Sequence, residues 1–294
     1  MPEVVVIGTA VTDIQAVKIP PVSSWAEKQR IGSISMMTGG DGANQSLRLA
    51  ALGRKTGLVA CVGHDTAGRM ILGELKQRGV DISRVCVHDS IPTGTSLVLV
   101  GEDGERHTFS AKGAHGEIRK EDCEGLLTED VKAPSLASLF SMPQLEDDGL
   151  CELLKDCRKQ KILTFADLGS DKRKQGLKGI QRFLPLLDFF LPSEEDALKM
   201  TGTSSPEDAA KVYHECGASS VVIKCGARGA HWKTADDSGW VPAKAVIPVD
   251  TTGAGDCMAA HFIHHCLNGK NIEDACRAAC IAASESTLFF GANS

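Results

Sequence analysis

The sequence lacks the features that mark a membrane-spanning, secreted or nucleic-acid-binding protein. None of its apolar runs approaches the roughly 20 residues that a helix needs to span a bilayer. The first residues, MPEVVVIGTA, lack a basic region and read as a strand, not as a signal peptide. With 32 Lys and Arg against 38 Asp and Glu, the formal charge is −6, and no basic block stands out. We therefore expect neither nucleic acid nor a membrane as a partner.

Paired cysteines and the common phosphate-loop motifs are also missing. The eleven cysteines are scattered singly, without a C-x-x-C pair. This pattern argues against a zinc or disulfide framework and for reduced thiols in a cytoplasmic protein. The chain has no G-x-x-x-x-G-K-[ST] loop, and no G-x-G-x-x-G follows the first strand-like segment. A dinucleotide-binding fold therefore loses its main support.

What is present is an alternation of strand-like and helical segments along the whole chain. Short apolar, often β-branched runs predict buried strands at Val4–Ile7, Thr56–Val62, Ile162–Ala166, Phe189–Leu191 and Val221–Lys224. The helical stretches between them predict an α/β fold with a mostly parallel sheet. Such a sheet binds ligands at the carboxyl ends of its strands.

Two further regions do not fit a buried parallel sheet. Segments near 15–37 and 95–110 alternate polar and apolar residues, and Asp103-Gly104 between two β-rich arms predicts a hairpin. We predict that residues 1–294 form a single domain with a small β lid made by about 14–37 and 92–112. Trp25 would then either cover a substrate or pack in an interface.

The stretch Val249–Ala260, VDTTGAGDCMAA, is the strongest local signal of a site. Small residues before an apolar helical segment let the backbone approach a ligand closely, and free amides at a helix N-terminus bind anions. Asp256 in this place could accept a proton from an attacking hydroxyl, as phosphoryl transfer requires. The same residue could instead only cap the helix, because Asp is a preferred cap. The stretch alone leaves both interpretations open.

A second glycine-rich segment, Gly39 to Asn44, reads as a loop that feeds a helix ended by Gly53. With DTTGAGD at 250–256, GGDGANQ at 39–45 and Gly8-x-x-x-x-Asp13, the chain resembles the ribokinase/PfkB family of carbohydrate kinases. The order and spacing of these motifs agree over nearly the whole chain. The resemblance implies a ribokinase-like three-layer αβα fold and the ATP-dependent phosphorylation of a hydroxyl on a sugar or sugar-like polyol. It also implies Mg²⁺ beside ATP and a homodimer formed through the lid.

The resemblance implies roles for individual residues. They are Asp256 as general base, the Gly253, Ala254 and Gly255 amides as an anion hole, Asp13, Gly40, Asp41 and Asn44 for the sugar, Ser193, Lys224, Gly226 and Gly229 for the nucleotide, and Asp250, Thr252 and Gly291 around a monovalent cation such as K⁺. For two of them the residues alone also allow plainer interpretations: Asn44 as a helix cap and Lys224 as a solvated charge. His261, His264 and His265 share helical spacing, and we interpret them as a solvated helix face, not as a zinc site.

Some positions depart from the family pattern. Ser193-Glu-Glu-Asp196 stands where the family often has Asn-x-x-Glu, Asp41 replaces the lysine of GGKGAN, and Ser141 stands where ribokinase has a sugar-contacting Glu. The last two changes argue against simple ribose as the substrate. A non-catalytic sugar-binding regulator stays open because of the changed Ser193 segment.

Two other substrate classes stay open within the same fold. A nucleoside kinase would need base stacking in the lid, for which Phe109 is the main candidate. A sugar-phosphate kinase would need a basic cluster there. Its members would be Lys28, Arg30, Arg106 and Lys112.

Overall fold

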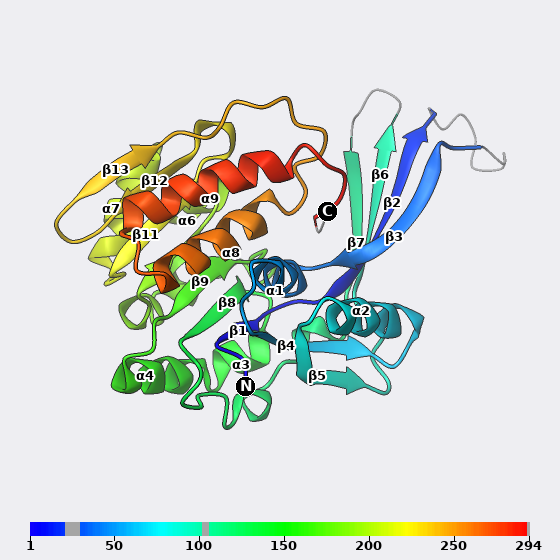
Figure 1. Ribbon diagram of the computed structural model, residues 1–294, viewed down its shortest axis with the longest axis horizontal. Helices are drawn as coiled ribbons and strands as arrows, with labels where there is room; N and C mark the ends of the chain where they lie inside the picture. The colour runs from blue at the N-terminus through cyan, green and yellow to red at the C-terminus, as the bar shows by residue number, and fades with distance from the viewer. Residues whose placement is uncertain (21–29, 102–105, 293–294) are drawn as a thin grey trace.

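The computed structural model describes residues 1–20, 30–101 and 106–292 and contains two β-sheets (Figure 1). The larger sheet has nine strands in the order β13-β12-β11-β10-β9-β8-β1-β4-β5. Its strands are β1 (Val4–Ile7), β4 (Thr56–Gly63), β5 (Asp81–His88), β8 (Ala133–Leu139), β9 (Phe165–Leu168), β10 (Phe189–Phe190), β11 (Ser220–Lys224), β12 (Ala230–Lys233) and β13 (Ser238–Val241). All neighbours are parallel except the β11–β12 and β12–β13 pairs. The predicted mostly parallel sheet is therefore confirmed.

Helices cover both faces of this sheet. Along β1, Val4 and Val6 belong to one hydrophobic core, whereas Val5 and Ile7 belong to the other, because successive strand residues point to opposite faces. The first core packs under α1 (Asp41–Ala51), α2 (Thr66–Gln77), α8 (Ala254–Leu267) and α9 (Ile272–Ser286). The second packs under α3 (Pro143–Asp147), α4 (Leu150–Gln160), α5 (Gly176–Ile180), α6 (Glu194–Thr201) and α7 (Pro206–Glu215). This arrangement confirms the predicted three-layer αβα fold.

The second sheet projects from one end of the body (Figure 1). Its order is β3-β2-β6-β7, with β2 (Val11–Ile19), β3 (Ser33–Gly39), β6 (Thr95–Gly101) and β7 (Arg106–Ala111). We call these four strands the lid; they fall close to the predicted 14–37 and 92–112. Strands β6 and β7 pair antiparallel, as the arms of a hairpin do, but Asp103-Gly104 and Trp25 lie outside the described residues.

The first helix begins earlier than its sequence suggests. We expected a glycine loop through Asn44, yet α1 already starts at Asp41, with Gly40 as its N-cap at a φ of 92°. A Cβ on Gly42 would lie 2.6 Å from the carbonyl carbon of Gly8, so glycine is needed where α1 approaches the end of β1. The glycines thus bring the helix start close to the sheet. Among the described helices, none combines the length and apolar character needed to cross a membrane.

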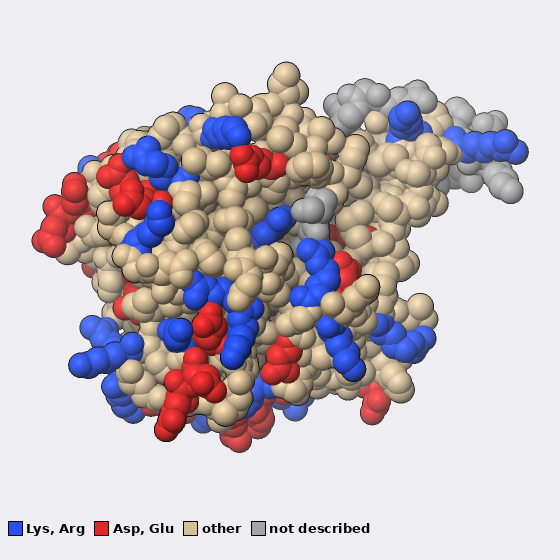
Figure 2. Space-filling model, in the orientation of Figure 1, with Lys and Arg blue, Asp and Glu red and all other residues tan. Residues whose placement is uncertain are grey.

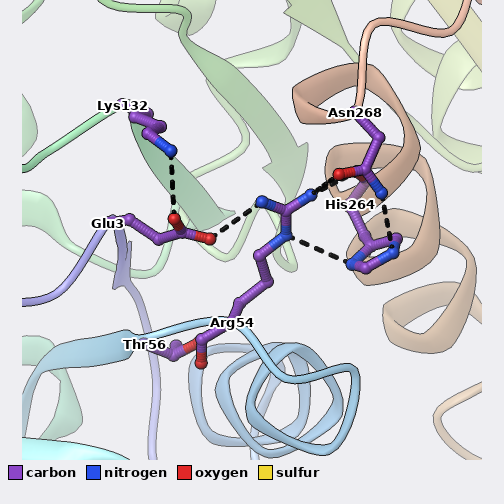
Figure 3. Close-up of polar contacts among 6 residues, drawn as sticks. All are labelled: Glu3, Arg54, Thr56, Lys132, His264 and Asn268. Atoms are coloured by element: carbon purple, nitrogen blue, oxygen red, sulfur yellow. Dashed lines mark hydrogen bonds and ion pairs between the residues drawn. The ribbon is translucent and has the colours of Figure 1, made fainter.

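A polar network connects the C-terminal end of α8 to residues just before strands β1 and β4 (Figure 3). The Arg54 guanidinium donates to the Glu3 carboxylate at 2.8 Å, to the His264 carbonyl at 2.8 Å and to Asn268 Oδ1 at 2.6 Å. Its Nε also donates to His264 Nδ1 at 3.2 Å. Because Arg54 meets a carbonyl in the last turn of α8, it stabilises the C-terminal end of the helix dipole.

The same network corrects our interpretation of the histidines. His264 packs against Arg54, and burial followed by the Arg54 charge lowers the pKa of its imidazole. Burial also lowers the pKa of His261, to about 4. These side chains are therefore not a freely solvated face, and within the described ranges no group of three or more His, Cys, Asp or Glu is placed to hold a metal ion.

We predict that Arg54→Met reduces the free energy of unfolding by about 3 kcal/mol, because it leaves the mostly buried Glu3 carboxylate with only the more exposed Lys132 as a charged donor and removes the charged donor of the His264 carbonyl. Urea denaturation measures this change. The matched control is Arg277→Met, since the Arg277–Glu273 pair is about half exposed on both sides, and it should cost no more than about 0.5 kcal/mol. Equal losses in the two variants would contradict the role given to Arg54.

Candidate active site

The N-terminus of α8 lies where the body meets the lid, and Asp256 stands in its first turn. The N-cap is Gly253, whose φ of 74° favours glycine, and among the described residues no side chain caps this helix. The Asp256 carboxylate instead accepts a hydrogen bond from Asn44 Nδ2 at 2.9 Å and a longer one from Gln45 Nε2 at 3.4 Å. The interpretation of Asp256 as a helix cap is therefore wrong. So is that of Asn44, because Asn44 lies inside α1 and reaches across to α8.

Backbone N–H groups at the start of α8 lie close to Asp256 in the sequence. The Ala254 N–H donates to the Thr251 carbonyl at 3.2 Å. Across the part of the chain that the structure describes, no acceptor is found for the N–H groups of Gly253, Gly255 and Asp256. A Cβ on Gly253 would lie 2.4 Å from that of Ala292, so only glycine fits this turn. The turn and the helix start thus present open amides at the positive end of the α8 dipole.

The electrostatics of the site suit a base that works near neutral pH. The pKa of Asp256 is raised to about 6, first by burial and then by the charge of Asp167, while the Asn44 amide, Lys224 and the Gln45 amide oppose the rise. Burial also raises the pKa of Asp41 well above its ordinary value, with help from the charges of Asp256 and Asp167. Carboxylates that share a confined space are harder to ionise together.

Two cavities meet at this helix start. The smaller has a volume of about 310 Å³ and lies between the lid and the body. Its lining includes residues named from the sequence: Asp13, Gly40, Asp41, Asn44, Ser141, Thr252, Gly253 and Asp256. The structure adds Ser96, Ser110, His115 and Lys172 to this lining. All four predicted sugar ligands are thus brought together. A Cβ on Gly39 would lie 2.0 Å from Asp13 Oδ2, which explains why the carboxylate needs a glycine beside it.

The larger cavity has a volume of about 590 Å³ and lies on the other side of the same turn. Its lining contains the four residues predicted for the nucleotide, which are Ser193, Lys224, Gly226 and Gly229. The apolar part of the lining consists of Ala243, Ala245, Val246, Pro248, Met258, Cys280 and Ala283. Thr251, Ala254 and Gly255 face this larger cavity, whereas Thr252, Gly253 and Asp256 face the smaller one. The junction of the two cavities is therefore the predicted anion-binding turn.

Lys224 is paired, not solvated. Its ammonium group forms an ion pair with Asp167 at the end of β9, and both side chains are largely buried. Burial raises the pKa of Asp167, and the charge of Lys224 lowers it. The interpretation of Lys224 as a solvated charge is wrong. Sequence reasoning missed Asp167, although a single carboxylate at the end of a predicted parallel strand could have indicated it.

Ser193 and Asp196, in the segment that departs from the family pattern, hydrogen-bond to each other. Ser193 caps α6, accepting from the Asp196 amide, and its hydroxyl donates to the Asp196 carboxylate at 2.6 Å. Ser193 still lines the larger cavity, and the charge of Asp196 raises the pKa of Asp167. Asp196 and Asp167 are therefore electrostatic neighbours beside this cavity.

The structure also brings together the three residues predicted around a monovalent cation. Asp250 is buried and accepts hydrogen bonds from the Thr252 hydroxyl at 2.7 Å, the Thr252 amide at 3.0 Å and the Gly291 amide at 3.0 Å. These bonds tie the C-terminal segment to the turn before α8.

The lid places Phe109 away from the smaller cavity. Ser110 and its partner Ser96 line the cavity, and Phe109 pairs with Leu97 on the opposite face because strand residues alternate. Phe109 is 60% exposed there. The expectation that Phe109 could stack on a nucleoside base is therefore wrong for the lid as it stands.

Comparisons with known proteins agree with the observed fold. A family model described as pfkB family carbohydrate kinase matches residues 1–294. The chain is 29% identical to the 2-dehydro-3-deoxygluconokinase of Bacillus subtilis, covering 90% of this chain and 85% of the relative. It is 26% identical to the ribokinase of Haemophilus influenzae, covering 87% and 83%. An E. coli structure described as a ribokinase II in complex with ATP and Mg²⁺ superposes with a TM-score of 0.83 at 23% identity, covering 100% of this chain and 95% of that one.

Proposed function

We propose, from the premise that this chain belongs to the pfkB family of carbohydrate kinases, that it transfers the γ-phosphoryl group of ATP to a hydroxyl of a sugar or sugar-like polyol with Asp256 as general base. One observation carries this proposal. The Asp256 carboxylate and the open amides of the α8 N-terminus converge where the two cavities meet.

In the proposed reaction the sugar occupies the smaller cavity and ATP the larger one. The substrate hydroxyl gives its proton to the Asp256 carboxylate while its oxygen forms the new bond to phosphorus. The bond between the γ-phosphorus and its bridging oxygen breaks, and ADP leaves. The Gly253 and Gly255 amides would hold the charge that spreads over the phosphoryl oxygens, which is the main requirement of this chemistry.

The residues beside the larger cavity fit a nucleotide that carries Mg²⁺. In such sites most ligands come from phosphate oxygens and water, so one or two carboxylates suffice. Asp167 and Asp196 are neighbours there, and Lys224 adds a cation for the phosphates. Mg²⁺ would neutralise phosphate charge when bound.

The smaller cavity suits a polyol. Asp13 and Asp41 supply carboxyl groups, while Ser96, Ser110 and Ser141 supply hydroxyls, so the lining can both accept and donate hydrogen bonds. Burial raises the pKa of Asp13 to about 6, which lets this residue exchange between the two roles near neutral pH.

A second candidate is an acidic sugar, either a sugar acid or a sugar phosphate. Lys172 lines the smaller cavity beside His115, and its charge, after burial, lowers the pKa of that imidazole. Arg30 and Lys112 are absent from the described lining of this cavity, while Lys28 and the Arg106 side chain lie outside what the structure describes. Lys172 is therefore the cation that favours an anionic substrate.

A panel of acceptors separates these candidates from one another. ADP release is measured with D-ribose, 2-deoxy-D-ribose, D-fructose, 2-dehydro-3-deoxygluconate, fructose 6-phosphate and adenosine. Turnover of neutral sugars alone would support the first proposal, and preference for either anionic compound would support the second. Tight sugar binding without ADP release would contradict both and favour a regulator.

For the acceptor that is turned over best, we expect Asp256→Asn to lower the rate by about 10²–10⁴-fold. The active base must be the deprotonated carboxylate, so kcat/KM of the unmodified enzyme should fall about tenfold per pH unit below a pH of about 6. Circular dichroism and the melting temperature check that the variant is folded. Near-normal activity in a folded Asp256→Asn variant would overturn the base assignment.

A monovalent cation at Asp250 stays a prediction of the resemblance. Three protein donors already meet the carboxylate, so the turn is held without an ion. We expect activity in tetramethylammonium buffer to remain within about threefold of that in K⁺, a small change compared with the removal of a catalytic group. A requirement for K⁺ would instead indicate that the cation completes the turn.

We also propose that the chain forms a homodimer through the outer face of the lid. Ile34, Met36 and Phe109 are 70%, 52% and 60% exposed on this face, and the strand register places Ile14 and Leu97 between them. On the face seen in Figure 2, Lys and Arg side chains of the described lid lie toward its tip, and the rest of it is mostly uncharged. Contiguous exposed apolar residues of this kind mark interaction sites.

Light scattering tests the dimer, which should have twice the chain mass of 31.2 kDa. Met36→Glu combined with Phe109→Glu should convert it to a monomer, because each substitution places a charge in the apolar face. Val87→Glu, at an exposed valine on β5, is the matched control and should leave the dimer intact. A monomeric unmodified protein, or an unaffected double variant, would contradict the proposal.

A further inference from the structure

Gln45 is a polar residue without solvent exposure that the mechanism above leaves without a role. It lies in the first half of α1, directly after Asn44. Its Nε2 donates to Asp256 Oδ1 at 3.4 Å, and its Oε1 accepts a hydrogen bond from the Ser135 hydroxyl at 3.0 Å. Ser135 is itself buried in β8. The amide therefore connects a central strand to the carboxylate at the start of α8.

We propose that Gln45 is a positioning residue that fixes the orientation of the Asp256 carboxylate, acting with Asn44 on the other oxygen. This inference rests on the proposed role of Asp256 as the base. Each carboxylate oxygen receives one amide donor, and the two donors come from consecutive residues of one helix. Since a carboxylate oxygen has two lone pairs, each oxygen keeps one for the substrate proton.

The chemistry of the partners fixes which way the amide of Gln45 points. An ionised carboxylate only accepts hydrogen bonds, so it must meet the NH₂ group, and the carbonyl oxygen must meet a donor. The Ser135 hydroxyl supplies that donor. Ser135 thus acts on the base through Gln45, from a strand that carries no other group proposed for the reaction.

Gln45 also acts on the charge of the base. Its donor stabilises the ionised form of Asp256, against burial and the negative charge of Asp167. Asp41 from α1 and Lys224 from β11 also interact electrostatically with Asp256, and Asp13, His115 and Lys172 line the same cavity. These groups remain unchanged when Gln45 is replaced, so a change in titration reports the lost amide.

The test uses Gln45→Met, which keeps the length of the side chain and removes both the NH₂ donor and the carbonyl acceptor of the amide. Ser135→Ala and the double variant are measured beside it. The titration of Asp256 is followed by ¹³C NMR of labelled aspartate, with Asp256→Asn assigning the signal. The second readout is kcat/KM against pH for the acceptor that the panel above identifies. Ser46→Ala is the matched control, because Ser46 is the next buried residue of α1 and its hydroxyl donates to the Gly42 carbonyl of its own helix at 2.7 Å.

We expect Gln45→Met to move the midpoint of the Asp256 titration upward by about half to one pH unit, in the direction that loss of a donor to a carboxylate requires. Turnover should fall by about tenfold or more, because a misplaced catalytic group loses rate steeply. Ser135→Ala, the milder change, should shift both quantities the same way by less. Adding Ser135→Ala to Gln45→Met should recover melting temperature, since it removes an unpaired buried hydroxyl, but should not recover turnover.

Other results would overturn the inference. One such result is an Asp256 titration that is the same in Gln45→Met as in the unmodified protein. Another is full recovery of turnover in the double variant, because it would indicate that Gln45 has a structural role alone. If Gln45→Met does not fold, an unchanged titration and rate in Ser135→Ala would count in the same way. Failure of the base assignment is distinguishable, because Asp256→Asn would then stay active whatever Gln45 does.

Discussion

A buried carboxylate beside open backbone amides is the constraint on which the rest of this site depends. Asp256 sits at the positive end of α8, yet its pKa is raised to about 6, mainly because burial disfavours the ionised carboxylate. Two amides from α1 and the charge of Lys224 oppose this rise. The Asp256 carboxylate is therefore held by residues that lie about 210 positions earlier in the sequence, and a movement of α1 against α8 would change both its orientation and its ionisation.

The close approach of these helices depends on glycines at a few positions. Gly42 lets α1 reach the end of β1, Gly253 lets the turn before α8 pass Ala292, and Gly39 makes room for the Asp13 carboxylate. Far from the site, Arg54 ties the other end of α8 to Glu3. Helix α8 is thus fixed at both ends, which suits the proposed reaction, because phosphoryl transfer relies on position and electrostatics more than on covalent steps.

The charged side chains of the site influence one another's ionisation. The charge of Asp167 raises the pKa of Asp256, the charges of Asp256 and Asp167 raise that of Asp41, and the charge of Lys224 lowers all three. In the proposed function, a polyol would add no charge to the smaller cavity, whereas an acidic sugar would bring an anion to Lys172 in its lining. The two proposed substrate classes therefore differ in the charge that they would add to this cavity.

The sequence by itself determined the family, the layered αβα architecture and the segments that surround the site. These follow from local patterns: β-branched runs for the strands, glycine before a helix for the turns, and motifs whose order is fixed along the chain. Only the tertiary structure decided what the polar side chains do. Asn44 and Gln45 turned out to meet Asp256, Asp167 to pair with Lys224, and His264 to bind Arg54, each across more than 50 residues of sequence. A single sequence contains no record of such contacts, because they arise when parallel strands and packed helices bring distant segments to one edge of the sheet.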